Sequence, residues 1–183
     1  MGYLSSKSGG QQDDPDLDRG NPEPLYRGWD PRSALAVDIR TGEPSGLYGD
    51  LPGVFLCINN SEYKSNYAHY VLDFIKNTGL DGLMHDDIHF GSQYFCGCRD
   101  CRTKFRGAMG YDLPANGQFP VDDYSNPVWR DWLRFRLISA RDQVRELRQR
   151  LPENLLFFAC MSAGVLNDAD VHHSGSSLEA LAE

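Results

Sequence analysis

Residues 82–105, GLMHDDIHFGSQYFCGCRDCRTKF, concentrate side chains that can do chemistry. They include two adjacent aspartates, two histidines and three closely spaced cysteines. Thiolates are preferred ligands of Zn²⁺, whereas carboxylates and imidazoles transfer protons or bind hydroxyl groups. We therefore expect a metal site and a catalytic or binding site next to each other.

The cysteine spacing CxCxxC, at Cys96, Cys98 and Cys101, predicts a structural Zn²⁺ site. Cys57 is the leading candidate for the fourth ligand because strand-end loops converge in a parallel α/β fold. His85 and His89 are the other candidates, whereas Cys160 lies in an apolar run and is expected to be buried and inert. Two alternatives stay open, namely reduced thiols packed on a helix and a redox-active CxxC pair. A zinc here would fix the loop that contains the candidate catalytic residues.

Asp86 and Asp87 are the candidate catalytic carboxylates. Adjacent side chains of a strand point to opposite faces, so the two cannot both face one substrate. Glycosidases use carboxyl groups about 5–9.5 Å apart, which predicts a partner from another strand. A capping aspartate at a strand end is the alternative. The residues expected to bind substrate at the same edge are Asn59, Asn60, His85 and His89, and a purely structural role stays open for each histidine.

Alternating apolar runs and helical patterns predict the elements that position these residues. Buried parallel strands are expected within 34–42, 53–60, 82–88 and 155–162, and helices over 62–78, 97–109 and 128–151. The arginine-rich face of the last helix is expected to be solvated. The expected fold class is α/β, a partial (β/α)₈ TIM barrel of about four βα units. A doubly wound open sheet is the competing architecture, although no Gly-rich phosphate loop follows the first strand.

Composition sets the remaining expectations. Residues 1–33 are predicted to be a loop-rich lead-in and 34–183 the partial barrel domain. Since a full barrel needs about 250 residues, a chain of 183 is expected to be a fragment. A net charge of −8 argues against nucleic acid, and no apolar run reaches the roughly 20 residues of a membrane span. Five cysteines, an odd number, favour a reducing compartment, the cytoplasm.

Residues 57–114 resemble part of a glycoside hydrolase barrel. Cys57 with Tyr63, followed by CxCxxC and Phe105, is similar to the zinc-cluster β-galactosidases, which implies that the four cysteines bind zinc. DGLMHDD resembles the fourth strand of hypothetical glycosyl hydrolases similar to α-fucosidases, in which Asp86 matches a strand-end carboxylate. The β-galactosidases have an Asn–Glu pair here, whereas this chain has Asp86, Asp87 and no Glu. The resemblance therefore implies an aspartate nucleophile or stabiliser rather than β-galactosidase chemistry.

The expected function is a glycoside hydrolase that acts on a carbohydrate. Asp86 would be the nucleophile or oxocarbenium stabiliser, Asp87 a substrate contact or supporting carboxylate, and the acid/base partner would lie outside this sequence. The fragment alone is then expected to be inactive, and a homo-oligomer of the full-length protein stays open. One alternative is a non-catalytic carbohydrate-binding barrel. The other is a metal-dependent hydrolase that uses the HDDIH residues, although their spacing differs from helical metalloprotease motifs.

Overall fold

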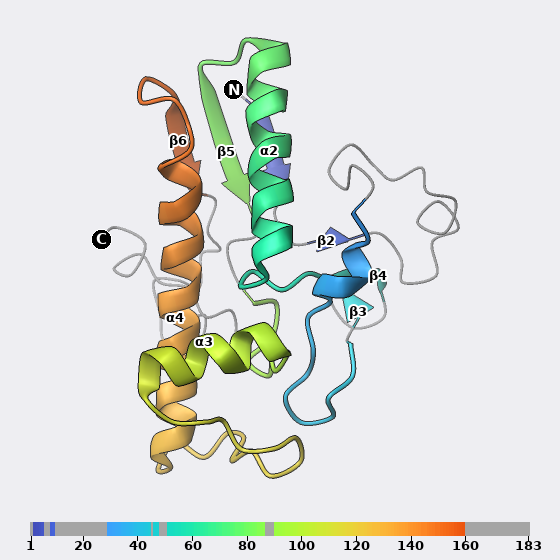
Figure 1. Cartoon of the computed structure of the whole chain (residues 1–183), viewed down its shortest axis with the longest axis vertical. Helices are drawn as coiled ribbons and strands as arrows, with labels where there is room; N and C mark the ends of the chain where they lie inside the picture. The colour runs from blue at the N-terminus through green and yellow to red at the C-terminus, as the bar shows by residue number, and fades with distance from the viewer. Residues whose placement is uncertain are drawn as a thin grey trace.

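The structure is a computed structural model that describes residues 2–5, 8–9, 29–44, 46–47, 51–86 and 90–159 (Figure 1). Its elements, in chain order, are β1 (Gly2–Ser5), β2 (Ser8–Gly9), the 3₁₀ helix η1 (Pro31–Ala34), β3 (Gly46–Leu47), β4 (Leu51–Phe55), α2 (Ser61–Thr78), β5 (Gly82–Asp86), α3 (Arg99–Met109), α4 (Pro127–Arg148) and β6 (Leu156–Ala159).

A three-stranded parallel sheet has the order β1-β5-β6. In its register Leu83 lies opposite Phe157 and His85 opposite Ala159. Between β5 and β6 the chain forms α3 and α4, because neighbouring parallel strands need a long crossover connection. The parallel strands expected within 82–88 and 155–162 are therefore confirmed over β5 and β6 (Figure 1).

The other two expected strands differ from the prediction. The strand within 53–60 is β4, which pairs antiparallel with β2 and β3 in a second sheet. Residues 34–42 contain only isolated bridges, since η1 ends at Ala34 and the Gly42 N–H closes a turn onto the Asp38 carbonyl at 2.8 Å. Ala36 and Ile39 are nevertheless buried, so this apolar run indicated burial but not strand pairing. The partial (β/α)₈ barrel stays a prediction.

Local end signals set the limits of the helices. The Asn60 side chain caps α2 by accepting the Tyr63 N–H at 2.8 Å, and Gly79 ends it in the left-handed conformation with φ of 63°. Gly110, with φ of 83°, ends α3 in the same way. Asn126 caps α4 ahead of a proline, which is favoured at the first helical position. These helices confirm the three predicted ones, with small differences at their ends.

Two apolar clusters form the core. In the sheet core, side chains of α2 and the second half of α4 pack on β5; its fully or nearly fully buried members include Leu83, Tyr67, Val71 and Leu147. In the α3 core, α3 and the first half of α4 pack on the loops around residues 36–39 and 90–96; its members include Phe105, Trp132, Phe135 and Ile39. Cys57, Cys96 and Cys101 belong to the α3 core, so the candidate metal ligands are built into its centre.

Several sequence expectations fall only partly on the described residues. The lead-in over 1–33 includes β1, β2 and the start of η1, whereas Cys160 and residues 161–183 lie outside the described part. No helix among the residues described is both long and apolar enough to span a membrane.

Candidate metal centre and strand-end residues

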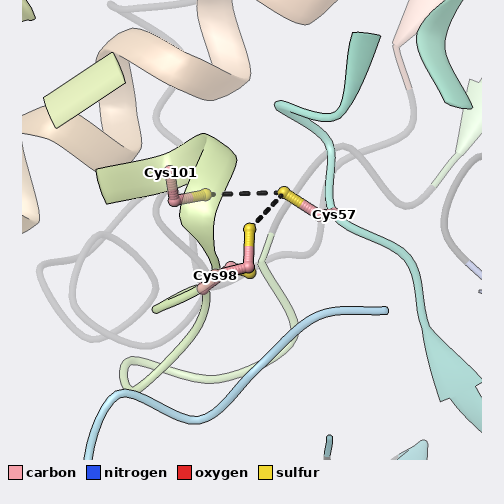
Figure 2. Close-up of side chains that lie close together, drawn as sticks. Cys57, Cys98 and Cys101 are labelled. Carbon is pink, nitrogen blue, oxygen red and sulfur yellow. Dashed lines mark hydrogen bonds between the residues drawn. The ribbon is translucent and has the colours of Figure 1, made fainter. Parts of the chain in front are cut away.

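Four cysteine sulfurs lie together, all within 4.8 Å of one another: Cys57, Cys96, Cys98 and Cys101. The Cys57 Sγ is 3.5 Å from the Cys101 Sγ and 3.4 Å from the Cys98 Sγ, and Figure 2 shows these three side chains pointing toward a common centre. Four thiolates around a tetrahedral Zn²⁺, with Zn–S bonds of about 2.3 Å, would be about 3.8 Å apart. The cluster therefore has the donor set and spacing to bind a metal ion such as zinc.

Two separate segments supply the four cysteines. Cys57 follows β4 in a turn, where its N–H donates to the Ala34 carbonyl at 2.7 Å. The other three precede or begin α3, with Cys98 at the N-cap and Cys101 in the first turn. Because the N-terminus of a helix favours negative charge, both positions stabilise a thiolate.

Gly97 explains the tight spacing between two of the ligands. A Cβ atom at this position would lie 2.8 Å from the Ile39 Cα, and the Gly97 N–H donates to the Val37 carbonyl at 2.7 Å. The loop therefore presses directly on residues 37–39. This contact fixes the backbone path between Cys96 and Cys98.

Two N–H groups donate to the sulfurs. The Val37 backbone N–H donates to the Cys96 Sγ at 3.3 Å, and the Asn59 side-chain amide donates to the Cys101 Sγ at 3.3 Å. Hydrogen bonds to a charged sulfur favour the thiolate, which is the form that binds metal.

Burial and mutual hydrogen bonding give the thiols different acidities. Burial, followed by hydrogen bonding with the other thiols, raises the pKa of Cys101 well above its ordinary value. Hydrogen bonds with Cys101 and then Cys57 hold the pKa of Cys98 well below its ordinary value. Cys98 is also the least buried of the four, and it borders an open pocket beside Arg102 and Arg106. The Cys98 side is therefore the most accessible side of the four sulfurs.

Asn59 and Asn60, both predicted to bind substrate, lie beside this cluster. Besides its contact with Cys101, Asn59 donates to the Ser139 Oγ at 3.0 Å. Asn60 caps α2 and donates to the Asp100 Oδ2 at 2.7 Å. Both side chains are buried and bonded within the protein. Substrate contact by these amides stays a prediction.

The strand-end residues are described only in part. His85 is fully buried, with its ring 5.5 Å from the Tyr67 ring and 6.0 Å from the Phe157 ring between ring centres. Asp86 ends β5. The Asp86 side chain, together with all of Asp87 and His89, lies outside the described residues, so their predicted roles are neither supported nor contradicted.

Sequence reasoning missed a buried cation beside the cluster. The arginines of α4 were expected as a group on a solvated face. Arg136 is instead fully buried and donates to the Ser92 carbonyl at 2.7 Å, with its guanidinium 5.2 Å from the Phe90 ring centre. Burial lowers the pKa of Arg136 to about 9, and the electrostatic interaction with Cys101 opposes that shift. Four thiolates around a divalent ion have a net charge of −2, which a nearby guanidinium partly offsets.

No protein-family model matches the chain, and the searches of curated proteins and of solved structures also found no match.

Proposed function

We propose that the chain is a zinc-stabilised part of a glycoside hydrolase-like α/β domain, with Asp86 as its strand-end carboxylate. The observation that carries the proposal is the meeting of four sulfurs from two segments on either side of β5. Cys57 precedes α2 and β5, and the other three cysteines follow β5. A zinc ion bound by all four would tie the chain leaving β4 to the chain leaving β5.

The position of the cluster supports a link between metal and chemistry. Residues 90–98 connect the end of β5 to α3, and they contain two of the four cysteines. In parallel α/β folds, ligands bind at the carboxyl ends of the strands. In Figure 1 the arrowhead of β5 points toward the half of the molecule that contains α3. A zinc at the cysteines would therefore fix the loop that begins at Asp86.

Exposed apolar side chains on β6 support membership of a larger domain. Leu83 and Phe157 pack in the sheet core, on the face covered by α2 and α4. Leu156 and Phe158, at alternate positions of β6, are 60% and 47% exposed. Since parallel sheets are ordinarily covered on both faces, we infer that a further apolar layer covers these residues, as the interior of a closed barrel would.

In this proposal Asp86 is the nucleophile or stabilises the oxocarbenium-like transition state. Its acid/base partner comes from another strand, about 5–5.5 Å away in a retaining enzyme. Asp87 and His89 are assigned to substrate contact. The role assigned to Asn59, Asn60 and His85 is to support the site without contacting substrate, since each is buried and contacts other protein groups.

Elemental analysis of the purified chain tests the metal part of the proposal. We expect about one zinc per chain, with four thiols that react only after a chelator is added. No metal, together with five freely reactive thiols, would contradict it.

Replacement of Asp86 by Asn in the complete protein tests the chemical part. The measurements are hydrolysis of a panel of aryl glycosides and sugar binding by calorimetry. Asp112→Asn is the matched control because that side chain is 76% exposed and follows α3 in the sequence, away from the end of β5. Loss of turnover with binding retained in Asp86→Asn alone supports the hydrolase. Binding without turnover in the unaltered protein favours the carbohydrate-binding alternative.

A further inference from the structure

The Asn59 side chain makes three hydrogen bonds beside the cysteine cluster. Its Nδ2 donates to the Cys101 Sγ at 3.3 Å and to the Ser139 Oγ at 3.0 Å. Its Oδ1 accepts a hydrogen bond from the Lys104 Nζ at 3.1 Å. The residue is only 9% exposed, so water contributes little to satisfying its amide.

The neighbours of Asn59 determine which way its amide points. A lysine ammonium can only donate, so the amide atom that faces Lys104 must be the oxygen. Lys104 is itself held by Asp142, with 2.9 Å between the Nζ and the Oδ2. The amide nitrogen therefore faces Cys101, and its N–H group is fixed in the direction of the sulfur.

We propose that Asn59 is a positioning residue of the metal centre, which holds the Cys101 sulfur as a ligand by an N–H···S hydrogen bond that Lys104 and Asp142 orient. This inference rests on the proposed metal site. Hydrogen bonds to charged acceptors are stronger than neutral ones, and partners of metal ligands fix both their direction and their basicity.

The same contacts join the metal centre to α4. Asn59 follows β4, Cys101 and Lys104 lie on α3, and Ser139 and Asp142 lie on α4. Three segments thus meet at one amide group. Binding of a metal by Cys101 would stabilise the packing of α3 on α4, and the packing would in turn hold the ligand.

Asn59→Asp tests this role with almost no change of shape. The carboxylate still accepts from Lys104, but it places an oxygen instead of an N–H group against the sulfur. We expect zinc affinity, measured by competition with a chromophoric chelator, to fall by about 10–100-fold. Asn126→Asp is the matched control, because that side chain caps α4 by accepting the Val128 N–H and a carboxylate does the same. Its zinc affinity should equal that of the unaltered chain.

Asn59→Ala provides a second readout that does not depend on how much of the variant folds. With Co²⁺ as the probe, loss of the N–H···S bond leaves a more electron-rich sulfur, so the sulfur-to-cobalt charge-transfer absorption should move to lower energy. Only the metal-bound molecules contribute to this absorption. An unshifted absorption in Asn59→Ala, or an Asn59→Asp variant that binds zinc as tightly as the control, overturns the inference. Absence of Co²⁺ and Zn²⁺ binding by the unaltered chain would instead overturn the proposed metal site.

Discussion

The two cores of this molecule are stabilised in different ways. The sheet core, where α2 and α4 pack on β5, consists of aromatic and aliphatic side chains, and Leu83 and Val71 at its centre are fully buried. The α3 core also buries aromatic rings, but it encloses three cysteines and lies against a buried arginine. Burial of apolar surface suffices for the first core, whereas four thiolates in the second would need a bound cation to offset their charge. Loss of metal should therefore affect one half of the protein much more than the other.

Removal of the metal should have the largest effect. Since structural zinc sites contribute about 10–16 kcal/mol of binding free energy, chelation should abolish amide hydrogen-exchange protection over α3. Protection over α2 should largely persist because its apolar contacts do not involve the cysteines. Hydrogen exchange followed by mass spectrometry measures both helices in one sample. Equal loss of protection in the two helices would refute the division into two cores, and Cys57→Ser should reproduce the chelated pattern.

Leu83→Ala addresses the opposite half. Truncation of a fully buried leucine costs about 2–5 kcal/mol of unfolding free energy. Chemical denaturation should detect this loss, while the Co²⁺ spectrum of the folded variant should stay unchanged. An altered spectrum would indicate that the two cores are coupled.

Gly97→Ala should have a smaller effect, confined to the metal side. The added methyl group would meet the Ile39 Cα at 2.8 Å and displace the loop between two ligands. Overpacking of this kind costs about 1–3 kcal/mol, which should appear as weaker zinc binding in a competition titration. Gly107→Ala is the matched control, since a Cβ there meets no atom within 4 Å and alanine favours the helix. A control that weakens zinc binding as much as Gly97→Ala would contradict this explanation.

The smallest effect is expected for Tyr111→Phe at the edge of the α3 core. The Tyr111 hydroxyl donates to the Asp131 Oδ2 at 2.8 Å, and its loss should lower the unfolding free energy by about 1 kcal/mol. Burial, followed by this hydrogen bond, raises the pKa of Tyr111 to about 12. A raised pKa means that the stabilisation is complete below the unfolded value near 10 and is lost as pH rises through 12. Denaturation midpoints of both proteins should therefore converge at high pH, and a constant difference would argue against the assigned bond.

Features that depend on nearby residues were predictable from the sequence. Gly79 marks the end of α2, and the crossover from β5 to β6 follows from their apolar runs and the helices between them. The capping role of Asn60 was missed, because this residue was predicted to bind substrate. Cys57 was also predicted to join the other three cysteines, and it does. The expected reason, convergence of strand ends in one parallel sheet, does not apply, because β4 belongs to the second sheet.

Features that depend on distant partners were not predictable. The apolar run around Ile39 is buried as expected, yet it forms a turn instead of a strand, because apolar character does not specify a pairing partner. For the same reason the run at 53–60 was predicted to be a parallel strand, whereas β4 pairs antiparallel with β2 and β3. The arginines of α4 were expected in solvent as a group because charge ordinarily avoids the interior, and only the fold shows the Ser92 carbonyl and Phe90 ring that lie beside Arg136. The contact of Asn59 with Cys101 spans 42 positions and has no local signal.

The separation of the ligands along the chain also has a consequence for folding. Cys57 and Cys101 are 44 positions apart, and the loop that a metal would close between them contains all of α2 and β5. By analogy with a covalent cross-link, closing such a loop reduces the entropy of the unfolded chain by an amount worth about 4 kcal/mol. Contacts this distant in sequence also form late, after local helices. We therefore expect metal binding to follow the packing of α2 on β5. The bound metal would then close a loop of the chain that contains both elements.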